Sequence, residues 1–188
     1  MLRNVQFHGR RTQAGASLIE VLVSIVIASI GLLALAGINA ASVRYSKLSQ
    51  YRSVAALMAQ DLADRMRANR GSTANVVQSY VLQQSFTAQA SLGSAPSPSC
   101  TLTTDSCTQA EMAAADLFAW RQAVRNNLPQ GSVYVEGAAT GSVNLWIVWQ
   151  DAQLGADDEY SELSAKDCHT SLGIHDKSVR CMFFRIQV

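Results

Sequence analysis

The stretch GASLIEVLVSIVIASIGLLALAG, residues 15–37, decides the architecture of this 188-residue chain. From Val21 to Ala41 the sequence contains no charged residue. A run of this length is typical of a transmembrane helix, because about 20 apolar residues span the hydrocarbon core of a bilayer. From Arg44 onward the sequence is polar and long enough for one ordinary soluble domain. We therefore expect one membrane helix followed by one soluble domain.

The charges around this run are unevenly distributed. Three basic residues, Arg3, Arg10 and Arg11, precede it with no acidic residue among them. The sequence after residue 15 carries 12 basic and 14 acidic side chains, without a basic stripe. This near-neutral balance predicts that nucleic acid is not a direct partner.

The apolar run does not fit an ordinary secretory signal. Such signals have an apolar stretch of about 7–15 residues followed by a small-residue cleavage site. Here the stretch is longer, and no clean site of that kind follows it. A plain single-pass anchor is the alternative, but Arg44, Lys47 and Arg52 balance the basic residues ahead of the run. The positive-inside rule therefore leaves the orientation undecided.

All four cysteines lie on the C-terminal side of the apolar run, at Cys100, Cys107, Cys168 and Cys181. An even, sparse count is typical of disulfides formed in an oxidising compartment. Three pairings are possible, and the close spacing favours Cys100–Cys107 and Cys168–Cys181. Disulfides would place the C-terminal domain outside the cytoplasm.

The segment Gly15-Ala16-Ser17-Leu18-Ile19-Glu20, between a basic leader and an apolar helix, resembles the class III signal of type IV pilins and pseudopilins. The resemblance implies that prepilin peptidase cuts between Gly15 and Ala16 and that Ala16 is then N-methylated. Most family members have Phe or Met where this chain has Ala16. Residues 1–15 would be the leader, and Glu20 would become the fifth residue of the mature protein.

The position of Glu20 requires a physical explanation, because inserting a carboxylate at the bilayer centre costs about 2.5 to 3.5 kcal/mol on insertion scales. A helix that starts at Ala16 places Glu20 near the N-terminal end of the bilayer core, where the helix dipole favours an acid. The resemblance implies that Glu20 meets the N-terminal amine of a neighbouring subunit during assembly. The alternative is a tolerated first-turn acid at the membrane edge.

Between Ala16 and Ala95 there is no proline, so we expect one helix to continue to about residue 70. Residues 16–41 would be its transmembrane half and residues 42–70 its amphipathic half, with Gly71 as a C-cap. Apolar residues at spacings of three and four form one stripe on the second half: Leu48, Tyr51, Ala55, Met58, Leu62 and Met66.

Residues 71–188 are expected to form the globular head. A short helix is predicted near Val76 to Phe86, and Thr108 with Glu111 forms a capping box for a second helix that ends at Pro129–Gly131. The segments SVYVEG (132–137), SVNLWIVWQD (142–151) and VRCMFFRIQV (179–188) are predicted strands, with Val143, Leu145, Ile147 and Trp149 on one face. The predicted fold class is α+β, a long N-terminal helix packed on a C-terminal antiparallel sheet.

The segments DLADRMRANR (61–70), DLFAWRQAVRNNLPQG (116–131) and RCMFFRIQV (180–188) are similar to the PilV group of type IV minor pilins. This resemblance implies a subunit that helps to initiate a type IV pilus or is incorporated into it. The implied partners are minor and major pilins, contacted through the N-terminal helix, and the prepilin peptidase and assembly platform of the inner membrane. The implied location is the inner membrane with a periplasmic head, and then the pilus at the cell surface.

Neither an enzyme nor a cofactor site is expected, because the sequence contains no GxSxG, HExxH, P-loop or GxGxxG motif. Cys168, His169, His175 and Cys181 lack the paired spacing of a zinc site, so a disulfide is the preferred interpretation. Asp157, Asp158, Glu159 and Glu162 could attract calcium but lack alternating oxygen ligands, so a solvated hairpin tip is preferred. No metal site is therefore predicted.

Two other functions stay open on the sequence. The first is a minor pseudopilin of a type II secretion system, which shares the leader and the helix, although the long 71–107 region favours the pilus. The second is a membrane-anchored binding or adhesion domain that keeps residues 1–15.

Overall fold

The computed structural model describes residues 15, 17–70, 76–102, 104–138, 141–151 and 167–188. The chain divides into two compact units, Met1–Val43 and Arg44–Val188. Helix α1, Leu18–Ala68, contributes to both units. The helix ends two residues before the predicted end, and the predicted cap Gly71 lies outside the described residues.

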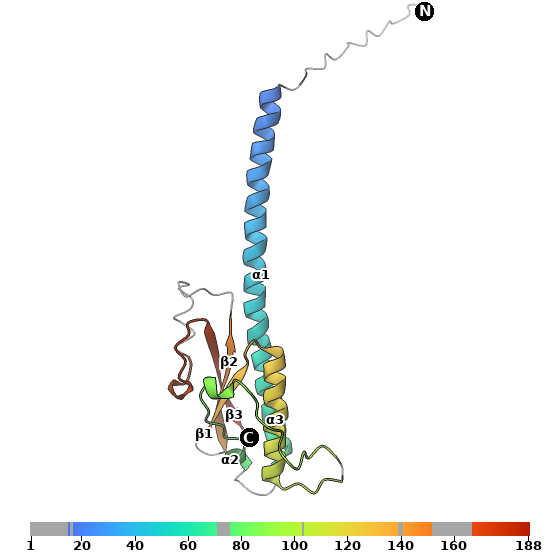
Figure 1. Ribbon diagram of the computed structural model, residues 1–188, viewed down its shortest axis with the longest axis vertical. Coiled ribbons are helices and arrows are strands. Elements are labelled where there is room, and N and C mark those ends of the chain that lie inside the picture. Colours follow the sequence, from blue (N-terminus) through green and yellow to red (C-terminus); the bar gives the residue numbers. More distant parts are fainter. Residues whose placement is uncertain (1–14, 16, 71–75, 103, 139–140, 152–166) are drawn as a thin grey trace, which may run out of the picture. The chain divides into compact units, whose positions relative to one another are not determined.

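The second unit combines helices with one antiparallel sheet (Figure 1). Three strands, β1 (Ser132–Ala138), β2 (Ser142–Gln150) and β3 (Val179–Gln187), are hydrogen-bonded in the order β1-β2-β3. Both pairings are antiparallel. Helix α3 (Gln109–Asn127) packs beside the C-terminal part of α1, and α2 (Val76–Ser79) and the short 3₁₀ helices η1 (Thr87–Gln89) and η2 (Thr170–Leu172) complete the unit. The predicted α+β fold is confirmed.

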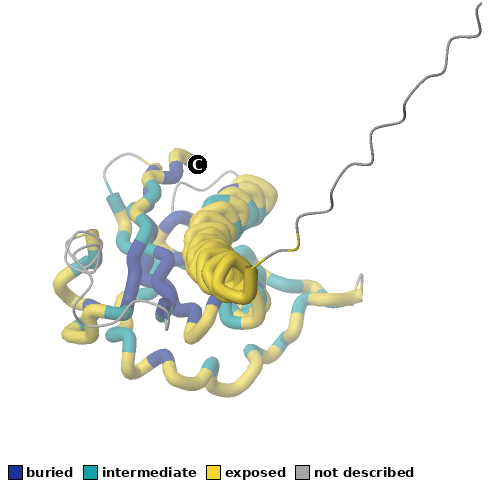
Figure 2. Tube along the Cα trace, turned by 90° about the horizontal axis from the view of Figure 1, so that it is seen from above, coloured by how far each residue is buried: buried dark blue, intermediate teal, exposed yellow. Residues whose placement is uncertain are grey.

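The core lies between the helices and one face of the sheet. The four residues predicted to share a face of β2 are all buried in it: Val143, Leu145, Ile147 and Trp149. In Figure 2 the buried segments gather in the strands. The sheet therefore buries the face that its alternating pattern predicts.

The predicted stripe on α1 also meets this core. Leu62 and Met66 are fully buried, and Tyr51 and Met58 pack partly buried against them. Ala59 and Ala63, outside the predicted stripe, are buried as well, so the buried face of the helix is wider than predicted.

The predicted helix from Val76 to Phe86 is wrong in its length. α2 ends at Ser79, and the backbone of Leu82 then forms an antiparallel bridge with Val135, with both N–H···O distances 2.9 Å. The bridge satisfies backbone groups on the outer edge of β1, which would otherwise lack strand partners. Pairing of Leu82 with the edge of β1 therefore replaces helix formation after Ser79.

Helix α3 begins with the predicted capping box. The Thr108 hydroxyl accepts from the Glu111 N–H, and the Glu111 carboxylate accepts from the Thr108 N–H at 2.8 Å. The Thr108 hydroxyl also donates to the Glu111 carboxylate at 2.8 Å. The hydrogen bonds that the carboxylate accepts from the backbone N–H and the hydroxyl of Thr108 lower the pKa of Glu111 below its ordinary value of 4.5.

The lowered pKa gives a testable pH dependence. A carboxyl group whose pKa falls on folding stabilises the protein above its unfolded pKa, and that stabilisation is lost as the pH falls. We expect Glu111→Gln to lower the melting temperature at pH 7 and the difference from wild type to shrink below about pH 4.5. Thermal melts of both proteins between pH 3 and pH 7 check this. A difference that is constant over the whole range would contradict the prediction.

A polar network ties α1, α2 and α3 together around Tyr80, which is fully buried. The Tyr80 hydroxyl donates to Asp116 Oδ2 at 2.7 Å and accepts from Asn69 Nδ2 at 3.2 Å. Arg65 Nη1 pairs with Asp116 Oδ1 at 3.3 Å. Burial and the hydrogen bond to Asp116 raise the pKa of Tyr80, so the hydroxyl stays protonated and donates.

We expect Tyr80→Phe to destabilise the protein by about 1–3 kcal/mol, because Asp116 then loses a buried donor. Urea titration followed by circular dichroism measures this change. Tyr45→Phe is the matched control, since Tyr45 is 63% exposed and should tolerate the change. Equal effects of the two substitutions would contradict the role of the network.

Candidate functional site

The first unit is built around the start of α1. The Ser17 carbonyl accepts from the N–H groups of Glu20 at 3.0 Å and Val21 at 3.2 Å, so the helix is already closed at its first turn. Glu20 lies in that turn, with its side chain exposed. An acid at this position interacts favourably with the positive end of the helix dipole.

The helix surface beyond Glu20 is apolar and open. Large side chains such as Leu22, Ile27, Leu33 and Ile38 are each more than half exposed. Its serine hydroxyls are satisfied within the helix, since Ser24 donates to the Glu20 carbonyl and Ser29 to the Ile25 carbonyl, both at 2.7 Å. The helix is long and apolar enough to cross a membrane, and its apolar window is not buried within the protein.

The surroundings of Glu20 leave space for a partner. An open recess beside it is lined by Val21, Ser24, Ile25 and Ala28, and two of these side chains are small. A group of another chain can therefore approach the carboxylate along the helix surface. Gly15, the last residue before the predicted cut, is exposed, and a side chain there would meet no atom within 4 Å. Ala16 and residues 1–14 lie outside the described residues.

Two family models match the chain. The model of the prokaryotic N-terminal methylation motif matches residues 10–36, and the Tt1218-like model, described as type IV pilin Tt1218, matches residues 38–118. The chain is a type IV pilin. No curated protein and no solved structure matches it.

The boundary between the two matches, at residues 36–38, lies close to the boundary between the two structural units, at residues 43–44. The methylation motif covers Gly15 to Glu20 and most of the apolar part of α1, whereas the second match covers the rest of α1, α2 and the first half of α3. The family is that of a structural subunit rather than an enzyme. A pilin with this motif is a substrate for prepilin peptidase.

The head of the pilin contains two disulfides, Cys100–Cys107 and Cys168–Cys181. They have the pairing that the sequence spacing favours. Both sulfur atoms that the zinc alternative would require are therefore used in a covalent bond. Among the described residues, no group of three or more His, Cys, Asp or Glu side chains could hold a metal ion. The acidic residues of the calcium alternative, 157–159 and 162, lie outside the described residues.

His169 has a packing role next to the second disulfide. Its ring stacks on Tyr134 with the ring centroids 4.3 Å apart and meets Trp146 edge-on at 4.8 Å. Nε2 lies 3.4 Å from Glu136 Oε2, and Nδ1 accepts from the N–H of Ser171. The sequence analysis missed this cluster, although the register that pairs Tyr134 with Trp146 follows from the alternation of the two strands.

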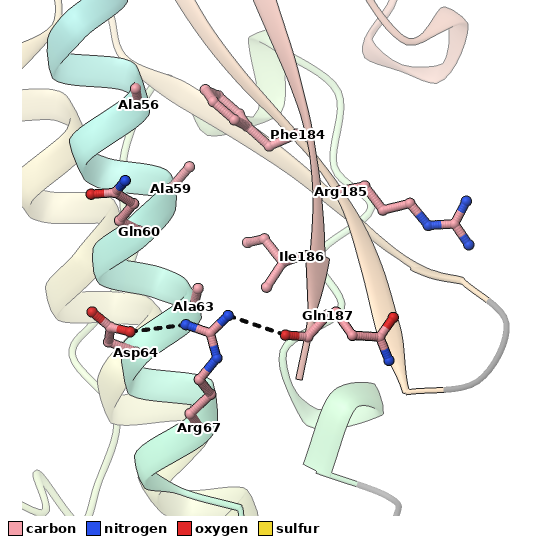
Figure 3. Close-up of a pocket in the computed structure, with 10 residues that line it drawn as sticks. All are labelled: Ala56, Ala59, Gln60, Ala63, Asp64, Arg67, Phe184, Arg185, Ile186 and Gln187. Carbon is pink, nitrogen blue, oxygen red and sulfur yellow. Dashed lines mark hydrogen bonds and ion pairs between the residues drawn. The ribbon is translucent and has the colours of Figure 1, made fainter.

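A surface groove of about 470 Å³ lies between α1 and β3. Figure 3 shows Phe184 and Ile186 pointing toward α1, whereas Arg185 points away. Arg67 closes one end, because its guanidinium donates to Asp64 Oδ1 at 3.0 Å and to the Gln187 carbonyl at 3.2 Å. Small side chains form the helix side of the groove: Ala56, Ala59 and Ala63. The lining is mixed, because five polar or charged residues lie beside the apolar ones: Gln60, Asp64, Arg67, Arg185 and Gln187. It contains no nucleophile beside a base.

Proposed function

We propose that this pilin is a minor pilin of the PilV group, which helps to initiate a type IV pilus or is incorporated into it. The observation that carries the proposal is the methylation motif over residues 10–36, joined to an apolar helix whose surface the protein itself leaves uncovered. Such a surface requires lipid before assembly and neighbouring helices afterwards.

The proposal includes the processing steps. Prepilin peptidase would remove residues 1–15 by cutting between Gly15 and Ala16, and Ala16 would be N-methylated. Glu20 would then be the assembly residue, because the new α-amine of a neighbouring subunit supplies the charge partner that a carboxylate in lipid requires. Residues 16–41 would span the membrane, residues 42–70 would form the amphipathic half of the helix, and residues 71–188 the head.

The proposed location is the inner membrane with a periplasmic head, followed by the pilus. The two disulfides support this orientation, since such bonds persist outside the reducing cytoplasm. The proposed partners are other minor and major pilins, the prepilin peptidase and the assembly platform of the inner membrane.

Mass spectrometry of the N-terminus of the membrane-extracted protein tests the processing. We expect a start at Ala16, with or without one methyl group. An intact leader, in cells whose prepilin peptidase cuts other substrates, would instead favour an ordinary membrane-anchored binding domain.

The role in the pilus requires a second test, because a minor pseudopilin would be processed in the same way. Deleting the gene and counting both surface pili and secreted enzymes separates the two. We expect fewer pili with normal secretion. Loss of secretion with normal pili would assign the protein to a type II secretion system.

A further inference from the structure

A second, smaller core lies on the face of the sheet opposite to α3. Its buried residues come from the three strands and from η2: Tyr134, Val148, Leu172, Val179 and Cys181. In Figure 1 the segment that contains η2, drawn in red ahead of β3, lies on that side of the strands. Leu172 is fully buried, so η2 is docked on the sheet rather than surrounded by solvent.

His169 is the N-cap of η2, and this cap requires a neutral imidazole ring. Its Nδ1 accepts a hydrogen bond from the backbone N–H of Ser171 at 3.2 Å. Because a backbone N–H only donates, Nδ1 carries no proton. The single proton of the neutral ring is therefore on Nε2, which faces Glu136 Oε2 at 3.4 Å. The hydrogen bond to Ser171 can exist only in this tautomer.

The contacts of the ring with the sheet do not depend on a neutral imidazole. Tyr134 stacks on the His169 ring, with the centroids 4.3 Å apart and the planes inclined by 17°. A carboxylate such as Glu136 and an aromatic face both attract a cation. Glu136 is itself held in place, because its Oε1 accepts from Asn144 Nδ2 at 3.0 Å. Protonation of His169 therefore keeps the ring on the sheet but removes its hydrogen bond to η2.

We propose that His169 is a pH-sensitive clamp, which holds η2 on the sheet when the ring is neutral and releases it when the ring is protonated. In acid, Nδ1 gains a proton and changes from an acceptor to a donor, so the Ser171 N–H loses its partner. Histidine is the side chain that ordinarily makes this change between about pH 5 and 8. This clamp goes beyond the proposed function, because it gives the head a response to acid that does not depend on the role of the pilin.

The surrounding contacts confine the change to the turn itself. The Cys168–Cys181 disulfide fixes the chain immediately before His169. The Leu172 carbonyl accepts from the N–H of Phe86 at 2.9 Å, which links η2 to the segment ahead of η1. We therefore expect Thr170–Leu172 to open in acid while the strands and the disulfide keep their places. The amide of Phe86 should respond together with that of Ser171.

Other titratable groups near the ring must be separated from His169. Those on the same face of the sheet or in the same segment are Tyr134, Glu136, Arg185, Asp167, His175, Asp176 and Lys177. The neighbouring residues of β2 on that face, Asn144 and Trp146, carry no charge, and neither does the segment 82–90. Hydrogen bonds from the backbone N–H and the hydroxyl of Ser178 lower the pKa of Asp176, so its carboxylate stays charged above about pH 5. His175, whose side chain is exposed, is the group that a control must address.

NMR of the isotope-labelled, full-length protein in detergent tests the clamp. The imidazole nitrogen spectrum shows which ring nitrogen carries the proton, and the scalar coupling between Ser171 N and His169 Nδ1 reports their hydrogen bond. At about pH 7.5 we expect the proton on Nε2 and a measurable coupling; at about pH 5 we expect a protonated ring and no coupling. Exchange of the Ser171 amide, relative to an unstructured amide at the same pH, should rise about fivefold, as for the loss of a typical N-cap. A proton on Nδ1 at the higher pH, or a Ser171 amide that the titration leaves unchanged, would overturn the proposal.

Two substitutions separate the clamp from a general effect of acid. His169→Asn keeps an N-cap acceptor that does not titrate, so Ser171 should stay protected at both pH values. His175→Asn makes the same change at an exposed histidine of the same segment and should keep the wild-type response. The N–H of Leu82, bonded to the Val135 carbonyl, is the reference amide and should not change. An unaltered response in His169→Asn, or a lost response in His175→Asn, would contradict the clamp. The wild-type spectra identify the tautomer by themselves, so they decide the proposal even if His169→Asn does not fold.

Discussion

Replacement of Trp120 by alanine is expected to destabilise the head by about 3–5 kcal/mol, the range typical of large aromatic residues removed from a core. Trp120 has no exposed surface and belongs to the cluster that joins α1, α3 and the sheet. Its indole N–H also donates to the Met58 carbonyl of α1 at 2.8 Å. The substitution therefore removes both the apolar contacts and the hydrogen bond that hold α3 on α1.

Urea unfolding of the detergent-solubilised protein, followed by tryptophan-independent far-ultraviolet circular dichroism, measures this loss. Leu57→Ala is the control, because Leu57 precedes the Trp120 partner Met58 on α1 and is 60% exposed. We expect the control to change the unfolding free energy by less than about 0.5 kcal/mol. A loss below about 1 kcal/mol for Trp120→Ala would mean that α3 is not held through this residue.

The regular elements could be predicted because their signals are local and repeated. The alternation of Val143, Leu145, Ile147 and Trp149 fixed the buried face of β2, and Thr108 with Glu111 fixed the start of α3. Such patterns depend on periodicity and on capping hydrogen bonds within one turn, so they can be recognised without knowledge of distant residues.

Elements that depend on distant partners could not be predicted in the same way. The helix expected from Val76 to Phe86 ends at Ser79, because the edge of β1, more than 50 residues later, pairs with Leu82. Tyr80 likewise meets Asp116, which lies 36 residues away along the chain. Helical periodicity contains no information about tertiary contacts of this kind, which can override local helix propensity.

The same distinction applies to the sites. The motif from Gly15 to Glu20 is continuous in sequence, so the resemblance to the pilin signal was visible, and the match to the methylation motif covers it. A narrow recess lined by Gln89, Arg121 and Ser132 is assembled from η1, α3 and β1, and its lining residues Gln89 and Val133 lie 44 positions apart. Only the folded arrangement shows that the Ser132 hydroxyl there has no hydrogen-bond partner among the described residues.

Glu20→Gln is expected to lower incorporation into pili at least tenfold while leaving membrane insertion and cleavage unchanged. Glutamine keeps the size and a hydrogen-bonding group of the side chain but removes its charge. Two opposite charges 4 Å apart attract by about 4 kcal/mol at an effective dielectric constant of 20, so an α-amine partner would lose most of its attraction. Insertion should persist, because the apolar surface of α1 that meets lipid is unchanged.

Quantitative immunoblotting of sheared pili and of the membrane fraction separates these effects. Ser24→Ala is the matched control, since Ser24 lies one turn further along the same recess and its hydroxyl bonds only within the helix to the Glu20 carbonyl. Glu20→Asp should retain partial incorporation, because it keeps the charge on a stem one methylene shorter. If Glu20→Gln entered pili as efficiently as wild type, the carboxylate would be only a first-turn acid tolerated at the membrane edge. The α-amine that the proposed cut would create would then require a partner outside the first unit, because the described part of that unit contains no second carboxylate.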